Sequence, residues 1–175
     1  WGRRCVSKTV NERMKPGDKF HLNNGLMVFE VTEVKKPEVI CKVVIGGELS
    51  NRKSMFFPEK ELKLVYLSEQ DKGDLLFGIE QGVDFVACSF VSKAQDIVDV
   101  RNFLHEHGSD DIDLIAKIEN RAGVTNLTSI LDVSDGLLIG RGDLGVEFPC
   151  AEHPDIQKTN LQPCCPPAKR RITPS

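Results

Sequence analysis

The chain of 175 residues lacks the features that mark several special classes of protein. Its longest apolar runs are far shorter than the roughly 20 residues that cross a bilayer, so no membrane span is expected. No signal-peptide pattern opens the chain. Lysine and arginine number 23 against 26 aspartate and glutamate, so neither a strongly basic face nor a nucleic-acid partner is expected. With 40% apolar and 28% charged residues, the composition excludes collagen, coiled coil and wholesale disorder.

Cysteines at metal-ligand spacing are also missing. The six cysteines include no C-x-x-C pair, and their spacing fits neither a zinc site nor a small disulfide scaffold. Cys41 and Cys88 lie inside apolar runs, where a cysteine commonly serves as a small buried hydrophobic residue. We therefore expect a reducing, cytoplasmic location. The chain begins at Trp1 without an initiator methionine, which suggests a fragment or a trimmed chain.

Residues 1–50 carry the pattern of short antiparallel strands. Turn sequences occur at 15–18 (KPGD) and at 23–25 (NNG), and the second is typical of a hairpin. Apolar and polar residues alternate at 26–34 and at 39–45, which predicts two strands. The predicted inward faces carry Met27, Phe29, Val31, Val39, Cys41, Val43 and Ile45. We interpret residues 1–50 as part of a small antiparallel β barrel or sheet.

Helix and strand patterns alternate over residues 68–158, after a transitional stretch at 51–67 that we interpret as a connection. Ser68 with Asp71, and Ser92 with Gln95, have the spacing of helix-capping pairs. The predicted strands are 83–90, 114–118 and 136–142, and the predicted helices are 68–80, 92–107 and 124–131. Three consecutive β-then-α units predict a parallel α/β fold, either a (β/α)8 barrel or an open doubly wound sheet.

Residues 159–175 break this alternation. Two adjacent prolines follow two adjacent cysteines there, and a Lys-Arg-Arg run comes next. Proline cannot continue a helix, so we expect a poorly ordered tail that arises from a shifted reading frame. The alternative is a genuine loop.

Two polar segments lie where predicted strands end, which is where parallel barrels place their active sites. In 114–120, the strand period of two puts Lys117 and Glu119 on the same side. In 140–145 (GRGDLG), three glycines around Asp143 let backbone N–H groups approach a small anion closely, and the carboxylate can hold a metal. The alternatives are a structural lysine–glutamate pair and a plain strand-to-helix turn.

The two carboxylates, Glu119 and Asp143, suit a hard divalent cation such as Mg²⁺. This ion usually takes one or two protein carboxylates and completes its coordination with substrate oxygens and water. A lysine beside it can stabilise negative charge that develops on a substrate oxygen. The pattern therefore predicts chemistry on an oxygen-rich anion, through an enolate or a phosphoryl group.

Several motifs in combination resemble the pyruvate kinase family. They are AKIEN at 116–120, GV at 123–124, SDG at 134–136 and RGDLGVE at 141–147. The upstream segments that agree are LSEQD at 67–71, FG at 77–78, GVDF at 82–85 and SFV at 89–91. The KPGD turn and the glycine pair at 46–47 resemble the β domain inserted in that family's barrel. The resemblance covers about residues 10–158 and has a bacterial character.

This resemblance implies an α/β fold: a partial (β/α)8 TIM barrel with an inserted small antiparallel β domain that acts as a lid. It implies Mg²⁺-dependent (or Mn²⁺-dependent) phosphoryl transfer from phosphoenolpyruvate to ADP, giving pyruvate and ATP in the last step of glycolysis. By the same resemblance, Lys117 is the catalytic lysine, and Glu119 and Asp143 are the metal ligands.

The resemblance also implies contacts to both substrates. Gly142 and Asp143 would offer backbone N–H groups to the pyruvate carboxylate, and Ser89 and Phe90 would border the substrate. Lys53 would contact a nucleotide phosphate, although solvated surface charge is the alternative for this residue. The family's K⁺ site lies on early barrel strands that have no counterpart in this chain, and the family's enzymes imply a homotetrameric parent.

The chain departs from the family pattern in two respects. It reads KSMFFPE at 53–59 where the family often has KGVNLPG, and no early barrel strands or catalytic threonine match. A closed barrel needs roughly 200–250 residues, more than follow residue 67, so we expect a fragment without turnover of its own. The alternatives are a metal-dependent aldolase of the phosphoenolpyruvate/pyruvate barrel superfamily and an inactive truncated product. Lys117 and Arg141 favour the kinase.

Overall fold

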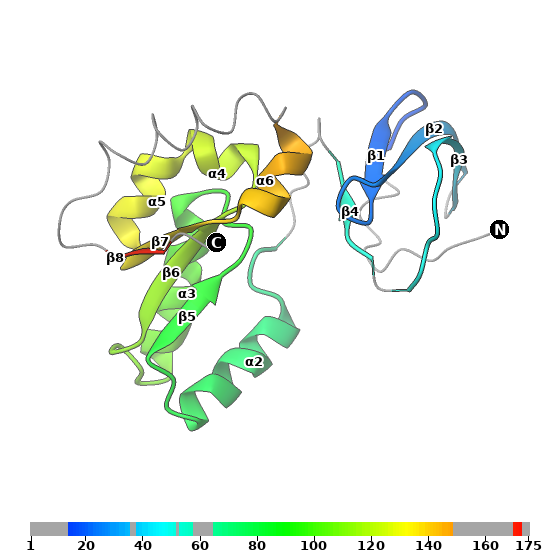
Figure 1. Ribbon diagram of the computed structural model, residues 1–175. Helices are drawn as coiled ribbons and strands as arrows, with labels where there is room; N and C mark the ends of the chain where they lie inside the picture. The colour runs from blue at the N-terminus through cyan, green and yellow to red at the C-terminus, as the bar shows by residue number, and fades with distance from the viewer. Residues whose placement is uncertain (1–13, 36–37, 52, 58–64, 149–169, 173–175) are drawn as a thin grey trace. The chain divides into compact units, whose positions relative to one another are not determined.

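The computed structural model describes residues 14–35, 38–51, 53–57, 65–148 and 170–172 (Figure 1). It divides into two compact units, with the boundary between Leu64 and Val65. The first unit holds antiparallel strands and the second alternates strands with helices. No helix in the described part of the chain is both long enough and apolar enough to cross a membrane.

The first unit is a four-stranded antiparallel sheet in the order β3-β2-β1-β4. Its strands are β1 (Lys19–Leu22), β2 (Met27–Lys35), β3 (Glu38–Ile45) and β4 (Met55–Phe56). The β1–β2 turn contains Asn23, Asn24 and Gly25, all with positive φ, which is the conformation that the NNG sequence favours. Its buried core is formed by Met14, Phe20, Leu22, Met27, Val31 and Phe57.

The predicted inward face of this sheet is only partly correct. Met27 and Val31 are almost fully buried, and Cys41 packs against the same core. Val43 and Ile45, however, are 55% and 52% exposed. The pairing of β2 with β3 shifts register between Val28 and Phe29, and the extra residue, Val44, interrupts the alternation and turns Ile45 off the face that carries Val43. Val43 itself lies opposite the half-buried Phe29, and its strand β3 is an edge strand of the described sheet. The end of β3 therefore lies outside the core.

The second unit contains a parallel sheet in the order β5-β6-β7-β8 (Figure 1). Its strands are β5 (Phe85–Cys88), β6 (Asp113–Ile118), β7 (Gly136–Ile139) and β8 (Arg170–Ile172). Its helices are α2 (Glu69–Glu80), α3 (Ala94–Glu106), α4 (Arg121–Thr125), α5 (Leu127–Val133) and α6 (Arg141–Glu147). This arrangement confirms the α/β class, and the four parallel strands among the described residues form an open sheet rather than a closed barrel.

Several element boundaries differ from those expected. The helix predicted at 124–131 is two helices, α4 and α5, which meet at Asn126. The third strand ends at Ile139 instead of residue 142, because helix α6 begins at Arg141. In the tail, residues 170–172 form β8 and pair with β7, whereas residues 149–169 and 173–175 lie outside the described part.

Helix caps explain where α2 and α3 begin and end. The predicted pair of Ser68 and Asp71 forms a capping box at the start of α2. At α3 the cap is displaced by one residue, since the N-cap is Lys93 and the carboxylate of Asp96 accepts from the Lys93 N–H. Gly82 and Gly108 follow the two helices with positive φ, which glycine adopts without steric cost.

The core of the second unit lies between the parallel strands and helices α3 and α5. Leu114, Ala116 and Ile118 on β6 have no exposed surface, nor do Ile97 of α3 and Ile130 of α5. The two charged residues of β6, Asp113 and Lys117, are half-buried and lie near its two ends, and Lys117 is the one near the carboxyl end. This places polar side chains at the carboxyl edge of the sheet.

Candidate active site

Three strand ends meet at the carboxyl edge of the second unit's sheet, because the carboxyl ends of parallel strands lie at the same edge. Ser89 and Phe90 follow β5, and Lys117 and Glu119 lie at the end of β6. The segment from Gly140 to Asp143 follows β7. The structure therefore brings the residues predicted at separate strand ends into one group.

Lys117 and Glu119 form the centre of this group. Lys117 Nζ lies 2.7 Å from Glu119 Oε1 and donates to Ser89 Oγ at 2.8 Å. The Glu119 side chain is only 4% exposed and that of Lys117 is 25% exposed. A carboxylate removed from water to this extent must be paired, and Lys117 supplies the opposite charge. The expected placement of both residues on one side of the strand is thus confirmed.

Phe90 contributes to the site through its backbone. Its N–H donates to Glu119 Oε2 at 2.9 Å, so both carboxylate oxygens of Glu119 have partners. Phe90 has a φ of 54°, a left-handed conformation that is uncommon for a residue with a bulky side chain. Its ring is 49% exposed. The turn is therefore held in a strained conformation that points one amide at the carboxylate.

Asn120 connects the same turn to helix α4. Its Nδ2 donates to the Phe90 carbonyl at 3.3 Å and to Ser92 Oγ at 3.0 Å, while its Oδ1 accepts from the Gly123 N–H at 2.7 Å. This residue was part of the recognised AKIEN motif, but no role was predicted for it. An asparagine directly before a helix is a common N-cap, and that signal could have revealed it.

Gly140 makes room for Glu119. A Cβ on Gly140 would lie 2.5 Å from Glu119 Cγ and 2.8 Å from Glu119 Oε1, both closer than non-bonded atoms approach. The φ of Gly140 is −81°, which any residue can adopt, so space rather than backbone freedom requires glycine here. The glycine-rich segment therefore forms the turn after β7 and also leaves space for the carboxylate that follows β6.

Asp143 lies in the first turn of α6 and is half-buried. Burial raises the pKa of its carboxyl above the ordinary value, the negative charge of Glu119 raises it further, and Lys117 lowers it. The second effect shows that Asp143 is close enough to Glu119 for the two negative charges to repel. The single positive charge of Lys117 therefore attracts two carboxylates. A cation held by Glu119 and Asp143 would relieve the repulsion between them.

The donor set limits which metal the site suits. Among the described residues there is no cluster of three or more histidine, cysteine, aspartate or glutamate side chains. A closed zinc site therefore has no basis in the described part of the chain. Mg²⁺ usually takes one or two protein carboxylates when substrate and water supply the remaining oxygens. Glu119 and Asp143 fit such an ion.

Cys88, one residue before this group, is chemically quiet. It is 5% exposed, and burial raises the pKa of its thiol to about 11. The thiolate is the reactive form of cysteine, so Cys88 stays protonated and unreactive near neutral pH. The prediction that Cys88 is a small buried hydrophobic residue is confirmed, while Cys41 is only partly buried.

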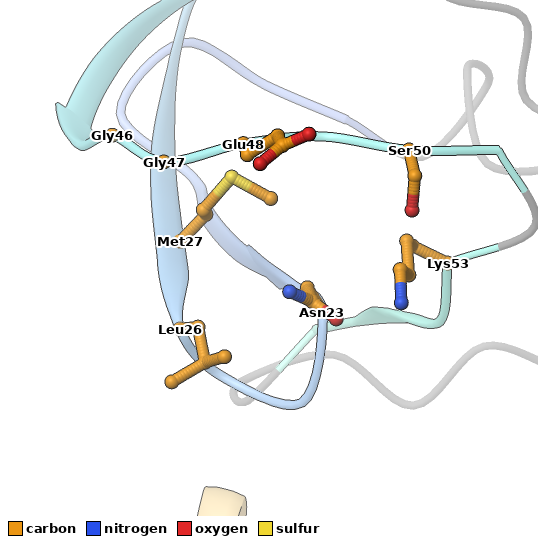
Figure 2. Close-up of a pocket in the computed structure, with 8 residues that line it drawn as sticks. All are labelled: Asn23, Leu26, Met27, Gly46, Gly47, Glu48, Ser50 and Lys53. Atoms are coloured by element: carbon orange, nitrogen blue, oxygen red, sulfur yellow. The ribbon is translucent and has the colours of Figure 1, made fainter.

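Lys53 belongs to the first unit, whereas the group described above belongs to the second. It lines a hollow of about 420 Å³ in that unit (Figure 2). The other lining residues are Asn23, Leu26, Met27, Gly46, Gly47, Glu48 and Ser50. Lys53 and Ser50 lie at the end opposite Gly46 and Gly47 (Figure 2). The glycine pair noted in the sequence is thus part of the same hollow as the lysine.

The fold and the site define a parallel α/β domain that carries a lysine and two carboxylates at its strand ends. The chain belongs to the pyruvate kinase family, since the family model for the pyruvate kinase barrel domain matches residues 5–174. Pyruvate kinase from Clostridium perfringens is 42% identical over 95% of this chain. Those from Bacillus licheniformis and Geobacillus stearothermophilus are each 45% identical, over 90% and 85% of the chain.

The chain spans only part of these relatives. It covers 35% of the length of the C. perfringens protein, 27% of the B. licheniformis protein and 26% of the G. stearothermophilus protein. Membership of the family is therefore established for the segment, and the activity of the whole protein is a matter for proposal.

The close approach of Glu119 to Gly140 predicts that a side chain at residue 140 lowers the stability of the protein. Gly140→Ala should lower the free energy of unfolding by about 1–3 kcal/mol, because the new methyl group displaces Glu119 from its partners. Chemical denaturation measures this. Gly73→Ala is the matched control, since a Cβ there meets nothing within 4 Å and alanine favours helix α2. Equal stability of Gly140→Ala and the natural chain would contradict the packing described here.

Proposed function

We propose that this chain is the part of a pyruvate kinase that holds the divalent metal and the transferring phosphoryl group. The reaction is phosphoryl transfer from phosphoenolpyruvate to ADP, which gives pyruvate and ATP. The observation that carries the proposal is the group formed by the buried Glu119 and the partly exposed Lys117 and Asp143 at the strand ends of a domain in this family. One cation beside two carboxylates suits a reaction in which negative charge moves between oxygen atoms.

Glu119 and Asp143 would hold the Mg²⁺ or Mn²⁺ ion. When bound, the ion neutralises charge on the phosphoryl and enolate oxygens. The supporting observation is the raised pKa of Asp143, to which the charge of Glu119 contributes, because carboxylates that repel each other gain from a shared cation. The Phe90 N–H also orients Glu119, and the lack of a side chain on Gly140 leaves room for its carboxylate.

Lys117 is the proposed catalytic residue. Its ammonium is a preformed positive charge held at 2.7 Å from Glu119 and 2.8 Å from Ser89 Oγ. Charge that is already in place lowers the barrier without reorganisation during the reaction. Lys117 would therefore stabilise the phosphoryl group in transfer and the enolate that remains.

The remaining contacts are assigned to substrate binding. The backbone N–H groups of Gly142 and Asp143 lie in the first turn of α6, where a helix leaves its N–H groups without intrahelical partners, and would bind the carboxylate of the substrate. Ser89 and Phe90 would border the substrate, since the Phe90 ring is half exposed. Lys53, at the hollow in the first unit, would contact a nucleotide phosphate.

The wider biological assignments follow from the family. We propose that the complete enzyme acts in glycolysis in the cytoplasm, assembles as a homotetramer and uses K⁺ at a site outside this chain. We also propose that the antiparallel first unit is the inserted domain that closes over the barrel. The aldolase alternative loses its support, because the family model and the relatives named above are pyruvate kinases.

The isolated chain should show no pyruvate kinase turnover, because the described strands form an open sheet with an unpaired edge at β5. Purified chain would be assayed with phosphoenolpyruvate, ADP and Mg²⁺ in a coupled lactate dehydrogenase reaction, with a complete relative as positive control. Turnover that EDTA abolishes would overturn this expectation.

Asp143→Asn in the complete enzyme should raise the Mg²⁺ concentration needed for half-maximal activity sharply, since one of two protein carboxylates loses its charge. A Mg²⁺ titration of activity measures this. Asp110→Asn is the matched control, because Asp110 is an exposed carboxylate that pairs with His105. If both variants keep the natural half-saturation point, Asp143 serves only the turn.

Lys117→Met in the complete enzyme should lower kcat by about 10²–10³ while Mg²⁺ binding is largely kept, because the variant loses the charge at the reacting oxygens and keeps much of the stem. Lys72→Met is the matched control, since Lys72 also pairs with a glutamate at 2.7 Å but on the surface of α2. Steady-state kinetics, metal affinity and the melting temperature are measured on one preparation. A purely structural role would instead lower the melting temperature and leave kcat near its natural value.

A further inference from the structure

The chain's single tyrosine, Tyr66, contacts the active-site group, and the proposed reaction gives it no task. Its hydroxyl donates to the Ser89 carbonyl at 2.8 Å. Tyr66 lies in the loop before helix α2, and its ring packs against the core of the second unit. The hydroxyl thus reaches from a fixed ring to the first residue after β5.

The turn that Tyr66 contacts is the most constrained part of the site. Ser89 Oγ accepts from Lys117, and the Phe90 N–H donates to Glu119. The next residue, Val91, donates its N–H to the Lys117 carbonyl at 3.2 Å. Every residue of the turn therefore touches β6 or the residue that follows it, and a displacement of the turn displaces both charged groups.

A left-handed residue such as Phe90 keeps its conformation only when the surroundings hold it there. The carbonyl of the preceding residue, Ser89, accepts a hydrogen bond from Tyr66. The carbonyl of Phe90 itself accepts one from Asn120. These two side chains therefore hydrogen-bond to the peptide groups on either side of Phe90. The Phe90 N–H, which belongs to the Ser89–Phe90 peptide, is thereby directed at Glu119.

Tyr66 is suited to this task by its surroundings. Burial raises the pKa of its hydroxyl well above the ordinary value, and the negative charges of nearby acidic groups raise it further. The phenol therefore stays protonated near neutral pH and remains a hydrogen-bond donor.

We propose that Tyr66 is a positioning residue, whose hydroxyl holds the Ser89–Phe90 peptide so that the Phe90 N–H orients Glu119 for the metal and Ser89 orients Lys117. This inference rests on the proposed function, in which Glu119 binds the metal and Lys117 acts on the substrate. It adds a residue outside the recognised motifs to the machinery of the site.

Tyr66→Phe removes one oxygen and keeps the ring. The variant should bind Mn²⁺ about three- to tenfold more weakly, which corresponds to the loss of one neutral hydrogen bond. It should also speed hydrogen exchange of the Phe90 amide, because this amide no longer stays on Glu119. A merely structural role for the hydroxyl would lower the melting temperature without a selective change at this amide.

Ser134→Ala is the matched control. This variant also removes a hydroxyl that donates to a backbone carbonyl at 2.8 Å, and Ser134 is more deeply buried than Tyr66. Ser134 lies before β7, at the amino edge of the sheet, which is opposite to the candidate site. This variant should lose stability and still keep natural Mn²⁺ affinity and Phe90 protection. Glu119→Gln is the reference for loss of the metal site.

The experiment is a Mn²⁺ titration by electron paramagnetic resonance on the 175-residue chain and its three variants, with amide exchange by NMR and melting temperature. If Tyr66→Phe keeps natural Mn²⁺ affinity and Phe90 protection while Glu119→Gln loses affinity, the role of Tyr66 is overturned and the metal site stands. If Glu119→Gln binds Mn²⁺ as the natural chain does, the metal assignment fails. In that case the exchange of the Phe90 amide alone decides whether Tyr66 holds the turn.

Discussion

The buried carboxylate of Glu119 is the constraint on which the rest of the site depends. A charge that is 4% exposed is costly unless each of its oxygens has a partner, and the chain supplies Lys117 for one oxygen and the Phe90 N–H for the other. Each partner imposes a further requirement. Lys117 must share a strand face with Glu119, and Phe90 must adopt a left-handed backbone conformation. Gly140 must remain without a side chain, because Glu119 occupies the space that a Cβ would need.

These requirements explain why the residues come from three successive strands. Parallel β/α units bring β5, β6 and β7 side by side with their carboxyl ends at one edge. Each strand end then contributes a different kind of group. The residues after β5 contribute a backbone N–H and a hydroxyl, and the end of β6 contributes the lysine and the first carboxylate. The segment after β7 contributes the free space at Gly140 and the second carboxylate. The apolar core beneath fixes the strands, so the positions of these groups depend on packing far from the chemistry.

The sequence predicts those parts of this arrangement that depend on local patterns of apolar and polar residues. The period of two placed Lys117 with Glu119, and strand–helix alternation gave the parallel class correctly. The exposure of Ile45 is not predicted, since a bulge depends on the pairing partner and leaves no trace in the strand's own alternation. The exposure of Val43 is not predicted either, because alternation does not show that β3 lies at the edge of the sheet. The contact of Tyr66 with Ser89 was missed for a related reason, because a bond between residues 23 apart arises from tertiary packing. The assignment of Lys53 to a nucleotide still rests on the family resemblance.

The charge balance of the cluster suggests how it would respond when substrate and metal are present. Glu119 and Asp143 together carry more negative charge than Lys117 compensates, and the raised pKa of Asp143 reflects this imbalance as well as its burial. In the proposed function, Glu119 and Asp143 would hold a divalent ion, whose positive charge would replace Lys117 as the main counterion of Glu119. Its ammonium, which donates to Ser89 Oγ at the partly exposed edge of the sheet, would then be available to a phosphoryl or enolate oxygen. The lysine that pairs with the buried carboxylate in the free protein would thus be the same group that the proposed reaction uses, which would link the stability of the site to its chemistry.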